Sequence, residues 1–280
     1  MPVQGGGRLG SVDDFFAPAR DRLRSLPGEA AAFAGDAEGS ELFCERADEP
    51  FPSASVIKLP LVMALYADAA RGRVDLEERV AVGDRVDGSG VLRHLHDVDM
   101  LSLRDLAMLA IIVSDNTATN RLIERFGVAR VNERMSEWGC ARSELARKMY
   151  DFDAAKRGHE NVMTARETVG LLVRLFCGEC EDRATSDAVL ALLAQCQDRT
   201  MLRRYLPYGA KVAHKTGTLD ESRNDAAIVS GDPTIVVAAF TRRLRDNEAA
   251  VSWLGVLGWC AYRAAGHESP PLPPELVRTA

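Results

Sequence analysis

The chain lacks the segments that would assign it to several broad classes of protein. No stretch of its 280 residues approaches the roughly 20 consecutive apolar residues that a membrane-spanning helix needs. The formal net charge is −6 without a long run of one sign, so we expect neither nucleic acid nor a membrane surface as a partner. Residues 1–7 show no basic segment followed by an apolar one. This predicts a cytoplasmic chain, or a periplasmic or secreted one if a leader was removed.

The six cysteines do not form a metal-binding pattern. Only Cys177 and Cys180 form a C-x-x-C pair, and the second pair that a structural zinc site needs is missing because Cys196 and Cys260 are isolated. We therefore expect reduced thiols near a helix end, with half of a zinc site or a redox pair as the alternatives. We expect no metal and no organic cofactor, since the motifs described below need neither.

The periodicity of apolar residues predicts helices in the centre of the chain and strands towards both ends. The expected helices cover residues 12–26, 56–70, 103–113, 118–126, 128–138, 164–176, 186–196 and 249–265. The expected strands cover residues 30–35, 41–45, 211–216, 225–230 and 234–242. The polar segment 143–163 has no clear period and predicts an extended loop, while the last dozen residues, with four prolines, predict a loose tail.

This order of elements predicts an α/β fold of the α+β type. One antiparallel sheet would be built from both chain ends and packed with the terminal helices, beside an all-helical lobe. We expect a single domain over residues 1–280, with an α/β lobe at about 10–52 and 205–267 and a helical lobe at about 53–204. A site would lie between the lobes. We expect a monomer or a weak dimer.

An S-x-x-K motif, Ser55-Val56-Ile57-Lys58, stands at the start of the predicted helix 56–70. A serine hydroxyl is a weak nucleophile unless a base lies within hydrogen-bond reach, and this spacing puts Ser55 and Lys58 on one helix face. Lysine acts as a base only when burial or nearby cations lower its pKa, and the apolar neighbours favour burial. The alternative is a helix-capping serine and a lysine whose stem lies along apolar surface.

The tripeptide Ser114-Asp115-Asn116 lies in a break between two predicted helices. The hydroxyl of Ser114 can relay a proton to a leaving group. The amide of Asn116 can position Lys58 and a substrate carbonyl, and Asp115 should point away and hold the turn. Taken alone, the tripeptide is an ordinary turn.

A third motif, Lys215-Thr216-Gly217, ends a predicted strand. Glycine there lets a ligand lie close against the strand. Lys215 and Thr216 can bind a carboxylate, so we expect a small-molecule substrate that carries one. The amide N–H groups of Thr218 and Ser55 would form an oxyanion hole.

Arg223, a few residues further on, is a candidate second cation for the same carboxylate. A solvated surface arginine is the alternative. The substrate-binding role of this residue therefore depends on the direction that its side chain takes in the fold.

The three motifs, in this order, resemble the signature of the class A β-lactamases and penicillin-binding proteins, and the resemblance covers most of the chain. It is carried by residues 51–59, 88–92, 113–120, 214–218 and 224–226. The resemblance implies that Ser55 is acylated, that Lys58 acts as a base and that Ser114 relays a proton. It also implies substrate binding by Asn116, Lys215, Thr216 and Thr218.

The sequence departs from this family in the loop that carries the deacylating base. The family has a glutamate in an E-x-x-L-N segment, about three dozen residues after the second motif. Residues 146–153 contain no such segment, and Asp151 and Asp153 are the nearest carboxylates. We take Asp151 as the candidate catalytic residue, with Asp153 or an unassisted water as alternatives.

The resemblance implies a serine hydrolase that forms an acyl-Ser55 intermediate and hydrolyses a β-lactam or a related cyclic amide. A missing glutamate leaves acylation through Lys58 intact but slows hydrolysis of the acyl-enzyme, which argues against an efficient antibiotic-resistance enzyme. The alternatives are an esterase or amidase that acts on a non-β-lactam substrate, and a penicillin-binding acyl sensor with little turnover.

Overall fold

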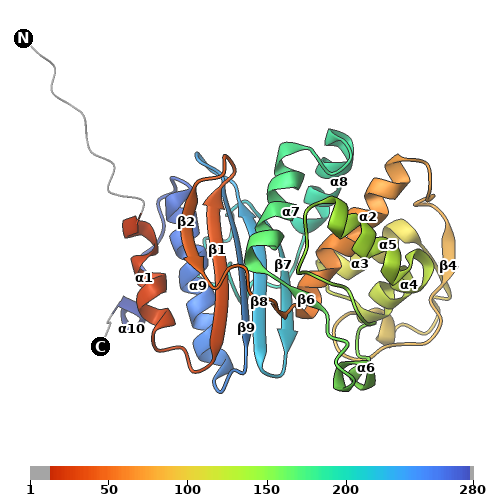
Figure 1. The fold of residues 1–280 in the computed structure, drawn as a ribbon, viewed down its shortest axis with the longest axis horizontal. Helices are drawn as coiled ribbons and strands as arrows, with labels where there is room; N and C mark the ends of the chain where they lie inside the picture. Colours follow the sequence, from red (N-terminus) through yellow and green to blue (C-terminus); the bar gives the residue numbers. More distant parts are fainter. Residues whose placement is uncertain (1–12, 278–280) are drawn as a thin grey trace, which may run out of the picture.

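The computed structural model describes residues 13–277, and its centre is a five-stranded antiparallel sheet with helices on both faces (Figure 1). The sheet, in the order β2-β1-β9-β8-β7, comprises β1 (Glu29–Asp36), β2 (Glu41–Glu45), β7 (Val212–Leu219), β8 (Ser222–Val229) and β9 (Ile235–Arg242). Two small ladders pair β3 (Phe51–Pro52) with β6 (Val162–Met163) and β4 (Arg79–Ala81) with β5 (Met100–Ser102). The α-helices are α1 (Asp13–Leu23), α2 (Lys58–Ala70), α3 (Leu103–Ile112), α4 (Asn116–Phe126), α5 (Val128–Glu137), α6 (Phe152–Lys156), α7 (Ala165–Cys177), α8 (Arg183–Leu193), α9 (Asn247–Ala264) and α10 (Pro274–Val277). Short 3-10 helices are η1 (Ala54–Ile57) and η2 (Leu92–His94).

The sheet separates two hydrophobic cores. On β9, the side chains of Val236 and Phe240 join the core of the central helices, while Ile235 and Val237 join the core beneath α1 and α9. This alternation is the two-residue period of a strand, so the unbroken apolar run of β9 reflects burial on both faces. Figure 1 shows α1 and α9 on one side of the sheet and α2, α7 and α8 on the other.

The expected α+β fold is confirmed, with strands from both chain ends in one antiparallel sheet. The lobe boundaries near residues 52 and 205 remain our proposal. Residues 10–12 of that division, the start of the first predicted helix at Val12, and residues 278–280 of the predicted tail lie outside the described residues. No helix within residues 13–277 is long and apolar enough to span a bilayer.

The first motif begins differently from the prediction. Ser55 lies on the 3-10 helix η1, and the α-helix starts only at Lys58 rather than at Val56. Pro60 supplies the reason, because it has no amide N–H to donate to the carbonyl of Val56 as an α-helix beginning there requires. The serine and the lysine therefore sit on either side of a helix boundary.

The third motif lies inside a strand, so the predicted strand end at Thr216 is wrong. Strand β7 runs on to Leu219 and pairs in register with β8, so that Gly217 lies opposite Asn224 and Leu219 opposite Ser222. The pairing with β8 outweighs the weak strand preference of Gly217.

Two segments contain more regular structure than expected. The loop 143–163 holds α6, whose N-terminus is capped by Asp151, and β6. The C-terminal tail holds α10. Conversely, α8 ends at Leu193, so Cys196 lies beyond the helix in which it was expected.

A buried ion-pair cluster fixes α5 against α2. The carboxylate of Asp68 accepts hydrogen bonds of 2.7 and 2.8 Å from Arg130 and one of 3.0 Å from Nε of Arg134. Burial raises the pKa of Asp68, but the hydrogen bonds from the two arginines outweigh it and lower the pKa to about 2. The carboxylate is therefore ionised at neutral pH, and its contribution to stability is lost only in strong acid, as pH falls through this pKa.

Replacing Asp68 by Asn should lower the free energy of unfolding by about 3 kcal/mol, because it removes the buried counter-charge of Arg134 and leaves that guanidinium only the half-exposed carboxylate of Glu137. Urea denaturation measures this change. The exposed Asp187, which pairs with Arg183, provides the control, and Asp187→Asn should change stability by about 0.5 kcal/mol or less. Equal effects of the two substitutions would contradict the role assigned to the cluster.

Candidate active site

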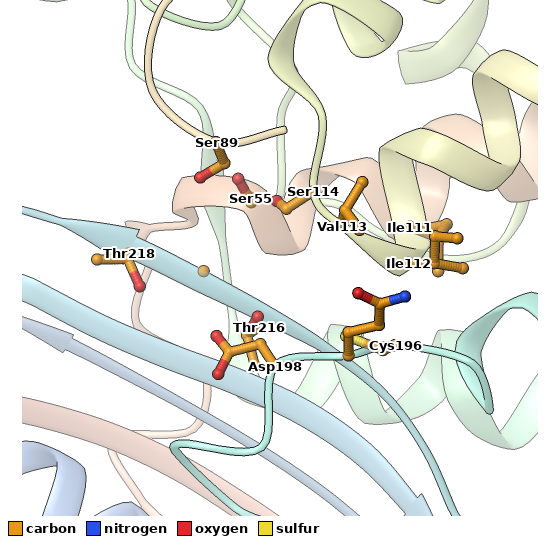
Figure 2. A pocket seen from close by; sticks show the side chains of 12 residues that line it. Ser55, Ser89, Ile111, Ile112, Val113, Ser114, Cys196, Asp198, Thr216 and Thr218 are labelled. Atoms are coloured by element: carbon orange, nitrogen blue, oxygen red, sulfur yellow. The ribbon is translucent and has the colours of Figure 1, made fainter. Parts of the chain in front are cut away.

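A cavity of about 330 Å³ brings the three motifs together. Its walls come from η1, from the loop before η2, from the end of α3, from the segment after α8, and from β7. Figure 2 shows Ser55 and Ser114 facing Thr216 and Thr218 across this space. Segments more than 150 residues apart in the sequence thus share one site.

The backbone around Ser55 is held against the sheet. The amide of Ser53 donates to the carbonyl of Asn161 at 2.8 Å, and the side-chain amide of Asn224 on β8 donates to the carbonyl of Pro52 at 2.8 Å. At Gly217 a Cβ atom would lie only 2.9 Å from the carbonyl oxygen of Ser53 and 3.0 Å from the amide nitrogen of Ser55. Only glycine permits this approach, and it places β7 beside the backbone of the serine.

Lys58 is fully buried and has three polar neighbours. Its Nζ lies 2.7 Å from the carbonyl oxygen of Ser114, 2.9 Å from Oδ1 of Asn116 and 3.2 Å from Oγ of Ser114. Burial and the nearby charge of Lys215 hold the pKa of Lys58 well below its ordinary value. A neutral amine has two N–H bonds for the two carbonyl-type acceptors, and its lone pair is left to accept a proton from a hydroxyl.

Ser114 lies between the two lysines. Its Oγ is 3.2 Å from Nζ of Lys58 and 3.1 Å from Nζ of Lys215. The backbone of Ser114 adopts a φ of 55°, which is uncommon for a residue with a side chain and directs the hydroxyl into the cavity. This geometry puts the hydroxyl of Ser114 within hydrogen-bond distance of both amines.

Asp115 and Asn116 hold the turn. Asp115 caps α4 by accepting from the amide of Ala118, and it also accepts from the amides of Val91 and Leu92 at 2.7 and 2.8 Å. Asn116 accepts from Lys58 through Oδ1 and donates through Nδ2 to the carbonyl of Asp87 at 2.8 Å. The carboxylate of Asp115 therefore makes only backbone contacts here, and the amide of Asn116 contacts Lys58.

Lys215 is also fully buried. Its Nζ donates to the carbonyl of Thr216 at 2.7 Å and to Oγ of Ser114, and burial lowers its pKa. Thr216, Gly217 and Thr218 line the cavity, with Thr218 exposed at its rim. The strand therefore places Thr216, Gly217 and Thr218 in the cavity wall, while the amine of Lys215 reaches the cavity through its bond to Ser114.

Asp198 is a cavity residue that the sequence did not indicate. It lies beyond α8, bonds to the amide and hydroxyl of Thr200 at 2.9 and 2.7 Å, and makes a side-chain hydrogen bond with Thr216. Burial raises its pKa, but these bonds and Lys215 outweigh burial and lower it, so the group is ionised at neutral pH. No motif in the sequence marks it, because only the fold brings the segment beside β7.

Arg223 and Asp151 are not among the residues that line the cavity. The guanidinium of Arg223 donates to the carbonyls of Leu219 and Ser222 at 2.5 and 2.7 Å, which folds the side chain over the β7–β8 turn. Oδ1 of Asp151 accepts from the amide of Ala154 at 2.9 Å and caps α6. The structure thus joins the other predicted residues in one site and places these two in structural contacts.

The loop before α6 is held against α4 by hydrogen bonds between the backbone of Met149 and the side chain of Asn120. The amide of Met149 donates to Oδ1 of Asn120 at 2.7 Å, and Nδ2 of Asn120 donates to the carbonyl of Met149 at 3.0 Å. Among the described residues that line the cavity, Asp198 is the one carboxylate. The loop expected to supply a base therefore supplies no cavity carboxylate.

Comparison with known proteins identifies the family. A family model described as the beta-lactamase enzyme family matches residues 18–265. The chain belongs to this family. Membership confirms the resemblance found in the sequence, and it supports the expected enzyme class, a serine hydrolase that acts on amide or ester bonds.

Individual members of the beta-lactamase family resemble the chain to different extents. Beta-lactamase BRO-1 of Moraxella catarrhalis is 26% identical over 200 residues, which cover 69% of this chain and 63% of that protein. The match thus spans less than two thirds of that relative's length. A beta-lactamase structure from Sphaerobacter thermophilus is 32% identical with a TM-score of 0.83, covering 91% of this chain and 99% of that one.

Two further structures support the same fold. The ancestral class A beta-lactamase GNCA is 25% identical with a TM-score of 0.80, covering 91% of this chain and 100% of that one. A point mutant of PBP-A, in an acyl-enzyme complex with penicillin G, is 24% identical with a TM-score of 0.80, covering 94% of this chain and 98% of that one. The class A resemblance is therefore confirmed at the level of family and fold.

The charge of Lys215 should be visible in the pH dependence of acylation. Lys58 must be neutral to act as a base, so activity rises as pH passes upward through its pKa. Lys215→Ala removes a neighbouring cation, which should raise the pKa of Lys58 and move the acidic limb of kcat/KM to higher pH.

Stopped-flow acylation by nitrocefin across the neutral range measures this limb. Lys215→Arg is the matched control, because it keeps the positive charge and should keep the limb near its wild-type position. An acidic limb that stays in place in Lys215→Ala would contradict the coupling of the two lysines.

Proposed function

We propose that this member of the beta-lactamase family opens a β-lactam or a related cyclic amide through an acyl-Ser55 intermediate. The observation that carries the proposal is the hydroxyl of Ser114 held between two buried lysines in the cavity that Ser55 lines. In this arrangement Lys58 is the base, Ser114 is the proton relay and Lys215 is the cation, while Ser55 is the nucleophile. These are the groups that acyl transfer needs.

Acylation begins when the hydroxyl of Ser55 attacks the substrate carbonyl and its proton passes to neutral Lys58. The amide N–H groups of Ser55 and Thr218 are the proposed donors to the oxyanion that develops, and the close approach at Gly217 supports their convergence. When the C–N bond breaks, Ser114 gives its proton to the leaving nitrogen and is reprotonated from Lys58. The product is an ester of Ser55.

Hydrolysis of that ester needs a water molecule and a base. Asp151 remains our candidate from the loop, but its carboxylate caps α6 and would have to leave that bond to act. Asp198 is tied to Thr200 and Thr216 on the side of β7. These contacts favour slow deacylation of a β-lactam ester.

Two other functions are favoured by the lack of a loop carboxylate among the described residues of the cavity. With no loop carboxylate among the described cavity residues, a long-lived penicillin-binding acyl sensor fits the site, as does an esterase or amidase whose natural ester deacylates more readily. The three functions share acylation of Ser55 and differ in the lifetime of the ester.

Ser55→Ala should abolish covalent capture of penicillin G, because no other hydroxyl in the cavity has the position of the nucleophile. Intact-mass spectrometry over time on the wild type and on the variant measures this. A lasting wild-type adduct would favour the sensor, and a transient one would favour hydrolysis. If Ser55→Ala formed as much adduct as the wild type, the mechanism would be contradicted. Ser89→Ala, which changes another serine of the cavity, is the control and should still be acylated.

Asp198 should weaken the binding of substrates that carry a carboxylate. Its own carboxylate is negatively charged, hydrogen-bonds to the side chain of Thr216 and lies near Lys215, so it competes with the substrate for both groups. Asp198→Asn should raise kcat/KM for penicillin G by about tenfold, which corresponds to about 1.4 kcal/mol. The methyl ester of penicillin G is the matched control and should gain little. An equal gain for acid and ester would show that Asp198 does not act through charge.

A further inference from the structure

A second group of chemically active side chains begins in the wall of the cavity and continues behind it. Cys196 follows α8 and lines the cavity, where Figure 2 shows it near the labelled Thr216 and Asp198. His214 stands on β7 directly before Lys215, and Asp225 stands on β8. His214 and Asp225 are fully buried, and Cys196 is 5% exposed.

His214 is oriented by Asp225. Its Nδ1 lies 3.2 Å from Oδ1 and 3.4 Å from Oδ2 of Asp225, whose Oδ2 also accepts from the amide of Leu202 at 3.1 Å. Burial lowers the pKa of the imidazole, but the carboxylate outweighs burial and raises it to about 10. At neutral pH the imidazole is therefore a cation held in a fixed direction.

The second ring nitrogen of His214 is the unusual atom. Nε2 is buried and has no hydrogen-bond partner of ordinary geometry in the described part of the chain. Cys196 and the imidazole interact electrostatically, and Cys196 contributes to the raised pKa of His214. Burial raises the pKa of the Cys196 thiol, but His214 and Lys215 outweigh burial and lower it.

The other buried cysteines have the opposite environment. Burial raises the pKa of Cys140, Cys180 and Cys260 to about 12, which leaves them as inert thiols. Cys44 and Cys177 are exposed and lie outside the cavity. Cys196 alone among the six joins a cavity wall to a histidine and a carboxylate.

We propose that Cys196 is a second nucleophile of this cavity and a modification site for small hydroperoxides, whose oxidation blocks the serine reaction. The arrangement of nucleophile, histidine and orienting carboxylate is that of thiol catalysis, and the cavity gives a small reagent its route. The sulfur of the thiolate attacks one oxygen of hydrogen peroxide, so that an S–O bond forms and the O–O bond breaks. His214 gives its proton to the departing hydroxide, which leaves as water, and the product is a sulfenic acid.

The block of the serine reaction rests on the proposed function, whereas the reactivity of the thiol does not. A sulfenic oxygen on Cys196 would project from the wall beside Thr216 and Lys215, where we place the substrate carboxylate. The modified enzyme should therefore fail to acylate, and a thiol reductant should restore it.

The first test measures the thiol directly. The full chain with Cys44→Ser and Cys177→Ser is treated with hydrogen peroxide at slightly acidic pH, and sulfenic acid is trapped with dimedone and located by peptide mass spectrometry. Cys196 should be labelled on the order of tenfold faster than the remaining buried cysteines, because thiolate rather than thiol reacts. Adding Ser55→Ala should leave this labelling unchanged, since the thiol reacts without the serine.

Two variants test whether Cys196 carries the label and whether His214 accelerates its reaction. Cys196→Ser should remove the label, and His214→Gln, which cannot become a cation, should reduce labelling of Cys196 to the level of Cys140. Labelling of Cys196 no faster than that of Cys140 in the folded protein would overturn the proposal, as would unchanged labelling in His214→Gln with an unchanged circular dichroism spectrum.

The second test measures the consequence. In the chain with Cys44→Ser and Cys177→Ser, peroxide should abolish acylation by penicillin G. When Cys196→Ser is added, acylation should be the same with and without peroxide. Labelling of Cys196 with no loss of acylation would overturn the claimed block while leaving the serine mechanism intact. If the untreated protein forms no adduct at all, the proposed function fails, and the dimedone label still decides the claim about Cys196.

Discussion

The site depends on keeping two lysine side chains close together inside the protein. Both are fully buried, and both reach the same hydroxyl of Ser114. Two buried cations repel each other and each loses its hydration, so the arrangement favours the form in which one of them, Lys58, is neutral. A neutral lysine can accept a proton, so the burial that destabilises the charged form of Lys58 also favours the form that acts as a base.

The rest of the fold keeps this pair in place. Strand β7 brings Lys215 at the edge of the sheet, and pairing with β8 along its whole length, Val212–Leu219, leaves it little freedom to move. The turn before α4 brings Ser114, and the capping bonds of Asp115 fix that turn. The glycine at 217 lets β7 approach the nucleophile segment. Each support comes from a different part of the chain, which explains why the motifs are separated by long stretches of sequence.

The central groups could be predicted from the sequence because their chemistry is local. The spacing of Ser55 and Lys58 and the turn at Ser114 specify their own geometry, and the three motifs together restrict the fold. The positions of Arg223 and Asp198 could not be predicted, since each depends on how a turn or a segment beyond a helix meets β7. The role of Asp151 as a helix cap depends on α6, a short helix in a stretch without apolar period. His214 and Asp225 were visible only as neighbours of a motif, and their pairing follows from the register of two strands.

The central claim is that Lys58 is neutral in the resting protein, and it can be measured at the atom itself. The chain has only five lysines, so NMR with lysine labelled at Cε and Nζ gives a spectrum that single lysine-to-arginine variants assign. We expect the signal of Lys58 to titrate far below the ordinary value of 10.5, because the amine is buried and lies near the charge of Lys215. A signal of Lys58 that titrates near 10.5 would contradict its role as the base.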